Sequence, residues 1–174
     1  MSRVFTLIPF LFLTLHLLSQ SPIDNALKRY NSGDIPYINT QTAAKWQQSD
    51  SVIFLDTRSY VEFEVSHLPK AQFIGYKEFN QEKIKSMTRM SDESFTLQKS
   101  TPIVVYCSIG VRSEQIGLKL KKLGFNNIYN LYGGIFLWYN ENREIVDSRD
   151  RSTREIHGYD KNWAQYIQGG KPRF

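Results

Sequence analysis

The sequence predicts a single α/β domain with a mainly parallel five-stranded sheet and helices on both faces. Residues 51–55, 103–106 and 127–131 are short apolar runs rich in β-branched side chains, which is typical of buried strands. Helical patterns lie between these runs, and strands that alternate with helices favour a parallel sheet covered on both sides. A chain of 174 residues is long enough to build one complete core.

Local start and stop signals define the elements before the central strand. In chain order, we expect a helix from Asp24, as N-cap, to Tyr30, then an edge strand at 36–39 and a helix capped by Thr40 or Thr42. The strand at 51–55 follows, and after it a helix with Ser59 and Glu62 as its capping box. A strand at 72–75 and a weak helix at 82–87 complete this half of the chain. The weak helix lies in a polar stretch, residues 76–98, that we expect to cover one edge of the site.

The second half of the chain begins with the strand at 103–106 and the loop at 107–113. After them we expect an amphipathic helix with Gly124 at its C-cap, the strand at 127–131, a turn at Gly133 and Gly134, a short apolar helix from Ile135 and a last helix around 163–167. We assign residues 36–168 to the domain, with its core at 36–141 and a C-terminal extension, and residues 169–174 to a disordered tail.

The amino terminus has the pattern of a secretory signal peptide, residues 1–19. Arg3 supplies a positive charge, and residues 4–18 are almost wholly apolar but shorter than the roughly 20 residues that a spanning helix needs. We expect cleavage near Ser19, an N-terminal arm at 20–35, export to a periplasm and no membrane contact afterwards. An uncleaved segment that anchors the protein in a membrane is the alternative.

The composition excludes several classes of protein. Hydrophobic residues make up 41% of the chain and charged residues 22%, as in ordinary globular proteins. The net charge of +5 is spread along the sequence, which fits a solvated surface better than a nucleic-acid site. One cysteine and three histidines, one of them in the signal segment, cannot form a Cys/His metal site. We therefore expect neither nucleic acid, nor a metal, nor another cofactor.

Cys107 is the candidate nucleophile, and it is the only cysteine in the chain. It stands between the end of a strand and the start of a helix, where unpaired backbone N–H groups and the helix dipole favour an anion. Arg112 adds a permanent positive charge five residues later. Both effects favour the thiolate, which is the reactive form, and equally an anion bound to the sulfur, such as a persulfide.

Three stretches together resemble the rhodanese family of sulfurtransferases. The segment Cys107-x-x-Gly110-x-Arg112-Ser113 after an apolar strand is similar to the family's active-site loop. The matching residues elsewhere are Phe54-Leu55-Asp56-Thr57-Arg58, Glu62-Phe63 and His67-Leu68-Pro69-Lys70-Ala71 upstream, and Gly124-Phe125, Asn130-Leu131, Gly133-Gly134 and Trp138 downstream. These parts come in the family's order and spacing and cover residues 36–141.

The resemblance implies a sulfurtransferase that works without a cofactor. Cys107 would take sulfane sulfur as a persulfide from a small anionic donor, such as thiosulfate or polysulfide, and pass it to a thiol or cyanide. The resemblance gives Asp56 a supporting role near the loop, and we assign the same role to Arg58 at the same strand end. The residues implied to bind the substrate are Ser108, Ile109, Gly110, Val111, Arg112 and Ser113. Nothing in the sequence requires a dimer, so we expect a monomer.

Two other functions stay open. The first is a binding module that has kept the fold without turnover. The second is phosphatase or arsenate-reductase chemistry, although related phosphatase domains place five residues between Cys and Arg and this chain has four.

The sequence departs from the family's pattern at two positions. In the family, a basic residue directly after the cysteine is associated with the use of thiosulfate, but this chain has Ser108 there, so the donor is undefined. Lys70 replaces the family's usual glycine, and we expect His67 to be structural.

Overall fold

The computed structural model describes residues 22–49, 52–82, 84 and 97–174. The predicted signal peptide, with its cleavage site, lies outside the described residues, and so does most of the weak helix predicted at 82–87. Among the residues that the structure describes, no helix is long and apolar enough to cross a membrane.

The centre of the molecule is a five-stranded sheet in which every neighbouring pair is parallel, as predicted. Its strands are β1 (Tyr37–Ile38), β2 (Ile53–Asp56), β3 (Gln72–Phe73), β4 (Ile103–Tyr106) and β5 (Ile128–Leu131), arranged in the order β1-β5-β4-β2-β3. The strand before the cysteine, β4, is therefore central, and all four of its residues are buried. Its end is the position at which parallel sheets collect functional groups.

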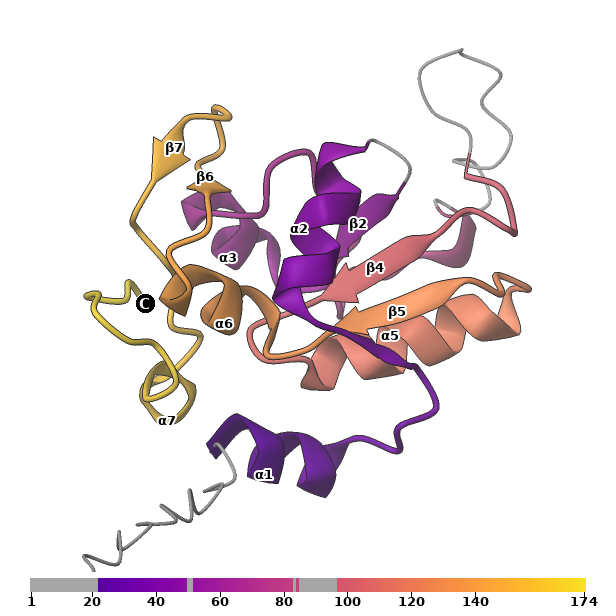
Figure 1. Cartoon of the computed structure of the whole chain (residues 1–174), viewed down its shortest axis with the longest axis horizontal. Helices are drawn as coiled ribbons and strands as arrows, with labels where there is room; N and C mark the ends of the chain where they lie inside the picture. Colours follow the sequence, from indigo (N-terminus) through magenta and orange to yellow (C-terminus); the bar gives the residue numbers. More distant parts are fainter. Residues whose placement is uncertain (1–21, 50–51, 83, 85–96) are drawn as a thin grey trace, which may run out of the picture.

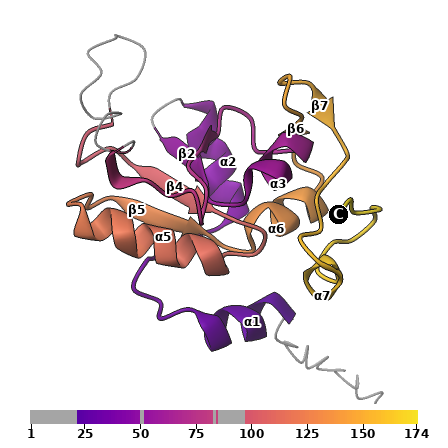
Figure 2. The same cartoon turned by 180° about the vertical axis from the view of Figure 1, so that it is seen from behind.

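Helices cover both faces of the sheet (Figure 1, Figure 2). On one face, Val104 and Tyr106 of β4 pack in a cluster with α2 (Thr40–Gln48) and α6 (Gly134–Asn140). On the other face, Ile103 and Val105 pack against α5 (Val111–Lys122). Because successive strand residues point to opposite faces, a continuous apolar strand can serve two cores.

The helix starts differ in part from the predicted caps. Ser59 and Glu62 form the predicted capping box at the start of α3 (Tyr60–Val65). At α2, however, Asn39 is the N-cap and accepts a hydrogen bond from the Thr42 N–H, so the assignment to Thr40 or Thr42 was wrong. The first helix, α1 (Pro22–Tyr30), begins before Asp24, with proline in its first turn.

The C-terminal extension is more ordered than its sequence suggests. It adds a short antiparallel pair, β6 (Ile145–Val146) and β7 (Ser152–Thr153), and one turn of helix, α7 (Lys161–Ala164). Residues 169–174 were expected to be a disordered tail, but Arg173 forms a β-bridge with His157. Two backbone hydrogen bonds, from the Gly158 N–H to Arg173 and from the Arg173 N–H to Ile156, hold this end in place.

Lys70 stands in a turn whose backbone geometry favours glycine. Lys70 has a φ of 62°, in the left-handed region that favours glycine, so its turn has the backbone geometry for which the related family uses glycine.

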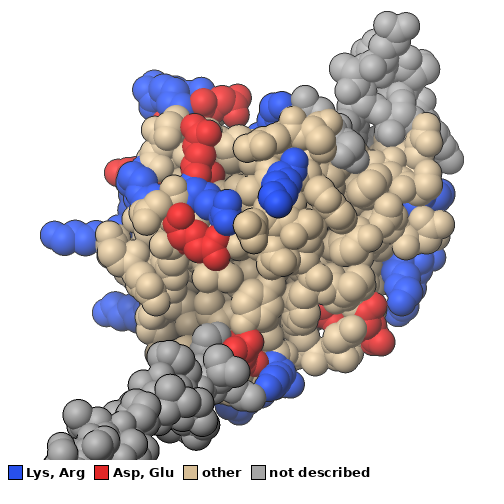
Figure 3. Space-filling model, in the orientation of Figure 1, with Lys and Arg blue, Asp and Glu red and all other residues tan. Residues whose placement is uncertain are grey.

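On the face drawn in Figure 3, basic and acidic side chains stand in small groups separated by uncharged surface. The positive charge visible there is dispersed.

Candidate active site

The loop between β4 and α5 holds Cys107 under the surface, with 1% of the residue exposed. Gly110 is the N-cap of α5 and has a φ of 116°, a conformation that L side chains rarely adopt. A Cβ at Gly110 would also lie 3.2 Å from the Leu27 side chain. Glycine therefore lets the chain reverse tightly around the sulfur and enter the helix at once.

The Cys107 Sγ lies within reach of hydrogen-bond donors from the loop and the first turn of α5. The Gly110 N–H donates to it at 3.2 Å, and the Ser113 hydroxyl oxygen is 3.6 Å away. Burial alone raises the pKa of the thiol, but the positive charge of Arg112 and hydrogen bonds from Ser113 and Gly110 outweigh it, so the pKa lies below its ordinary value. The surroundings of the sulfur therefore favour the thiolate over the thiol.

The start of α6 fixes the outer side of the same loop. The Ile135 and Phe136 N–H groups donate to the carbonyls of Cys107 and Ser108, at 2.9 and 3.0 Å. A Cβ at Gly134 would lie 2.3 Å from the Cys107 carbonyl oxygen, so only glycine permits this approach. The two carbonyl oxygens are thus bound to another helix and are kept from turning toward the sulfur.

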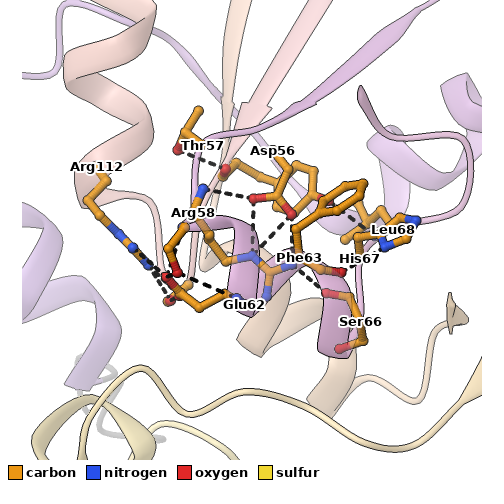
Figure 4. Close-up of polar contacts among 12 residues, drawn as sticks. Asp56, Thr57, Arg58, Glu62, Phe63, Ser66, His67, Leu68 and Arg112 are labelled. Carbon is orange, nitrogen blue, oxygen red and sulfur yellow. Dashed lines mark hydrogen bonds and ion pairs between the residues drawn. The ribbon is translucent and has the colours of Figure 1, made fainter. Parts of the chain in front are cut away.

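Arg112 forms an ion pair with Glu62 across the mouth of the loop (Figure 4). Its Nη1 and Nη2 donate to the two carboxylate oxygens, each at 2.8 Å, and Nη2 also donates to the Ser108 hydroxyl at 2.9 Å. Such paired contacts fix both position and orientation. The sequence predicted a permanent positive charge at Arg112, and the structure pairs that charge with a carboxylate.

Glu62 lies at the site, although the sequence indicated it only as part of the capping box and of the family resemblance and not as a site residue. Its carboxylate accepts hydrogen bonds from the Ser59 N–H and hydroxyl while it binds Arg112. Burial raises its pKa, but the hydrogen bonds and charge of Arg112, with the more distant Arg58, lower it to about 2. Glu62 is therefore ionised and joins the start of α3 to the cysteine loop.

Two asparagines fix the Gly110 carbonyl, and neither was predicted as a site residue. Asn130 of β5 donates to this oxygen at 2.8 Å, and Asn31, after α1, donates at 2.9 Å. The Asn130 carbonyl oxygen also accepts from the Ser113 hydroxyl at 2.8 Å. Asn130 is fully buried, and the resemblance to a family was the only signal that pointed to it.

Asp56 and Arg58 lie beside the loop but act on each other (Figure 4). The Arg58 guanidinium donates to both Asp56 oxygens, at 2.7 to 3.1 Å, and both side chains are fully buried. Arg58 also donates to the Ser66 carbonyl. This pair ties the end of β2 to the end of α3, and α3 carries Glu62. The supporting role that the sequence analysis assigned to both residues stays a prediction.

A pocket of about 100 Å³ opens above the cysteine. Its lining residues are Cys107, Ser108, Ile109, Val111, Arg112, Tyr159 and Trp163. The first five were predicted as site residues, whereas Gly110 and Ser113 support the loop from behind its surface. Tyr159 and Trp163 come from the C-terminal extension, which the sequence had indicated only as a packing element.

His67 has structural contacts, as expected. Its Nδ1 lies 3.0 Å from the Phe63 carbonyl oxygen, and its ring stacks on the Phe63 ring with 3.9 Å between centroids. Across the described residues, His, Cys, Asp and Glu side chains form no group of three or more that could hold a metal ion.

Removal of one partner from the buried Asp56–Arg58 pair should be strongly destabilising. Asp56→Ala leaves a buried guanidinium without its carboxylate, so we expect the free energy of unfolding to fall by about 3–5 kcal/mol. Glu155→Ala is the matched control, because it breaks an exposed pair with Arg173 and should cost less than about 1 kcal/mol. Denaturant unfolding measures both, and equal losses would contradict the role given to Asp56.

The low pKa of Glu62 predicts a stability that depends on pH. An ordinary glutamate titrates near 4.5 and Glu62 near 2, so its contribution is complete above pH 4.5 and is lost as the pH falls toward 2. The loss should reach about 3 kcal/mol. Glu62→Gln should remove this slope, whereas Glu64→Gln, at an exposed carboxylate of the same helix, should retain it. A wild-type slope in Glu62→Gln would refute the assignment.

Comparisons with known proteins identify the family of this chain. The Rhodanese-like domain family matches residues 39–141. A tRNA uridine(34) hydroxylase of Enterobacter sp. (strain 638) is 27% identical over 116 residues, which are 66% of this chain and 32% of that protein. The chain thus spans about a third of the length of the curated relatives it matches.

Solved structures share the fold. The rhodanese-like domain from Anabaena sp. superimposes with a TM-score of 0.54 at 18% identity, covering 64% of this chain and 79% of that one. The polysulfide-sulfur transferase homodimer from Wolinella succinogenes gives a TM-score of 0.51 at 23% identity, covering 71% and 85%. Because the family match at residues 39–141 covers more than half of the sequence, this chain belongs to the rhodanese-like domain family.

Proposed function

We propose that the protein is a sulfurtransferase that carries sulfane sulfur on Cys107 between a donor and a thiophilic acceptor. The strongest support is the environment of Sγ, where the Gly110 N–H and the Ser113 hydroxyl face a sulfur whose pKa is lowered. These groups stabilise a thiolate, and they would stabilise the terminal sulfur anion of a persulfide in the same way.

The reaction needs no oxidant beyond the donor itself. The Cys107 thiolate attacks the outer sulfur of the donor, and a new S–S bond forms to Sγ. The donor's own S–S bond breaks, and its electron pair leaves with the carrier, which is sulfite when the donor is thiosulfate. A thiol or cyanide then attacks the outer sulfur of the persulfide and restores the thiolate. Over one cycle, only one sulfur atom has moved.

Features of the loop favour this chemistry over phosphate transfer. Four residues separate Cys107 from Arg112, which makes a small cradle. The guanidinium is already bound to Glu62 on two nitrogens, so a tetrahedral dianion would have to compete with a carboxylate for it. The name of the Wolinella neighbour, a polysulfide-sulfur transferase, agrees with sulfur as the group transferred.

We also propose that the protein acts after export, as a monomer. The apolar run at residues 4–18 behind Arg3 supports export, and it is too short for an ordinary membrane span. Fractionation of cells that produce the full chain, followed by mass determination of the mature protein, tests both the location and the cleavage near Ser19.

Intact-mass spectrometry tests the sulfur transfer. We expect the wild type to gain the mass of one sulfur atom after exposure to a sulfane-sulfur donor, and to lose it again on addition of cyanide. Cys107→Ser should fold and gain nothing, because it lacks the nucleophile. If no donor adds sulfur to the wild type, the sulfurtransferase function is wrong and a binding module becomes the better account.

A further inference from the structure

We propose that the C-terminal extension forms the outer wall of the donor site and makes it select sulfane sulfur carried on a small apolar group over a dianion such as thiosulfate. This inference rests on the proposed sulfurtransferase function and adds the class of donor. The residues that carry it are Tyr159 and Trp163, which lie beyond the family match at 39–141.

Both aromatic side chains stand directly over the nucleophile's loop. They line the same pocket as Cys107, together with Ile109 and Val111. The Tyr159 ring covers the Arg112 guanidinium, with 4.5 Å from the guanidinium carbon to the ring centroid. A donor that reaches Sγ therefore passes against two aromatic faces and two aliphatic side chains. Sulfur and apolar groups make favourable contacts with aromatic rings.

The wall is held in place by specific contacts. Tyr159 has a φ of 64°, which is strained for a bulky residue, and its N–H donates to His157 Nδ1 at 2.9 Å. The Asp160 carboxylate then caps α7 and accepts from the Trp163 N–H at 3.1 Å. These contacts fix the backbone that carries the two aromatic side chains.

The N-terminal helix supports the wall from the other side. The Tyr30 ring at the end of α1 lies 6.0 Å from the Trp163 ring, centroid to centroid. One residue later, Asn31 donates to the Gly110 carbonyl of the cysteine loop. Segments before and after the family match therefore meet at the pocket, and in Figure 1 α1 and α7 lie at the same end of the molecule.

The charges around the pocket disfavour a dianionic donor. Among the described residues that line it, Arg112 carries the formal positive charge, and Glu62 balances that charge through two hydrogen bonds of 2.8 Å. Thiosulfate would bring two negative charges beside an ionised carboxylate. A hydropersulfide, R–S–SH, brings an apolar R group and one titratable sulfur. The pocket chemistry therefore fits R–S–SH with a small alkyl or aromatic R.

The transfer from such a donor is balanced. The Cys107 thiolate attacks the outer sulfur of R–S–SH, the bond from Sγ to that sulfur forms, and the R–S to SH bond breaks. The electron pair leaves on R–S⁻, and the proton remains on the outer sulfur of the new persulfide. The hydrogen-bond donors of the loop then favour its loss to solvent. The released thiolate, with its R group against Tyr159, departs through the exposed side of the pocket. Tyr159 itself is 46% exposed.

The experiment measures the rate of persulfide formation on Cys107, with benzyl hydropersulfide and with thiosulfate as separate donors. The reaction is quenched at a series of times and the product is measured by mass spectrometry. The readout is the ratio of the two second-order rate constants. A substitution that changes only the reactivity of Cys107 changes both rate constants alike and leaves this ratio unchanged. We expect Tyr159→Ala and Trp163→Ala each to lower the ratio, benzyl over thiosulfate, by about tenfold. Tyr159→Phe keeps the ring and should keep the ratio.

Controls separate this inference from the function on which it rests. Tyr60→Ala removes a tyrosine of similar exposure, 53%, that does not line the pocket, and should leave the ratio unchanged. Thermal unfolding checks that the variants fold, and Trp163→Leu replaces Trp163→Ala if the latter does not. If both donors load Cys107 and the ratio is the same in every variant, the selective wall is refuted and the transfer function stands. If neither donor loads Cys107, both proposals fall.

Discussion

In the proposed reaction a buried sulfur must carry negative charge, and the rest of this site depends on that constraint. Cys107 is almost fully enclosed, and a buried anion is costly unless hydrogen bonds and opposite charge compensate it. The compensation comes from the Gly110 N–H, the Ser113 hydroxyl and the charge of Arg112. Each of these is in turn fixed by a second contact, so the loop has one arrangement.

The second contacts link the loop to four other parts of the fold. Asn130 binds both Gly110 and Ser113 from β5, and the N-terminus of α6 binds the Cys107 and Ser108 carbonyls. Asn31 reaches the loop from the end of α1. Glu62 holds Arg112 from α3, where the same carboxylate completes a helix cap. One side chain thus sets both where a helix starts and where the loop's cation lies.

Local patterns in the sequence predicted most of the fold and the centre of the site. Apolar runs identified β2, β4 and β5, and the Ser59–Glu62 spacing identified the start of α3. The place of Cys107 between strand and helix made it the candidate nucleophile. Each of these signals lies within a few neighbouring residues, so a single sequence can reveal it.

The parts that were missed depend on contacts between distant residues. Glu62 and Arg112 are 50 residues apart, and no local pattern states that they pair. Tyr159 lies in the C-terminal extension and was not predicted as a site residue, because only the folded chain brings it over Arg112. The error at α2 has a different cause, since Asn39, Thr40 and Thr42 can all act as caps and the backbone selects among them. The tail at 169–174 looked polar and glycine-rich, yet a backbone bridge to His157 orders it.

The measurement that tests the central claim most directly is an absorbance titration of the Cys107 thiolate. The difference between wild type and Cys107→Ser isolates the cysteine from the tyrosines, and the unfolded chain in denaturant supplies the reference. We predict a folded midpoint below the unfolded one, and a shift of the midpoint back up in Ser113→Ala, which removes one donor to the sulfur. A folded midpoint equal to or above the unfolded one would mean that burial outweighs the loop's donors, and it would contradict the account.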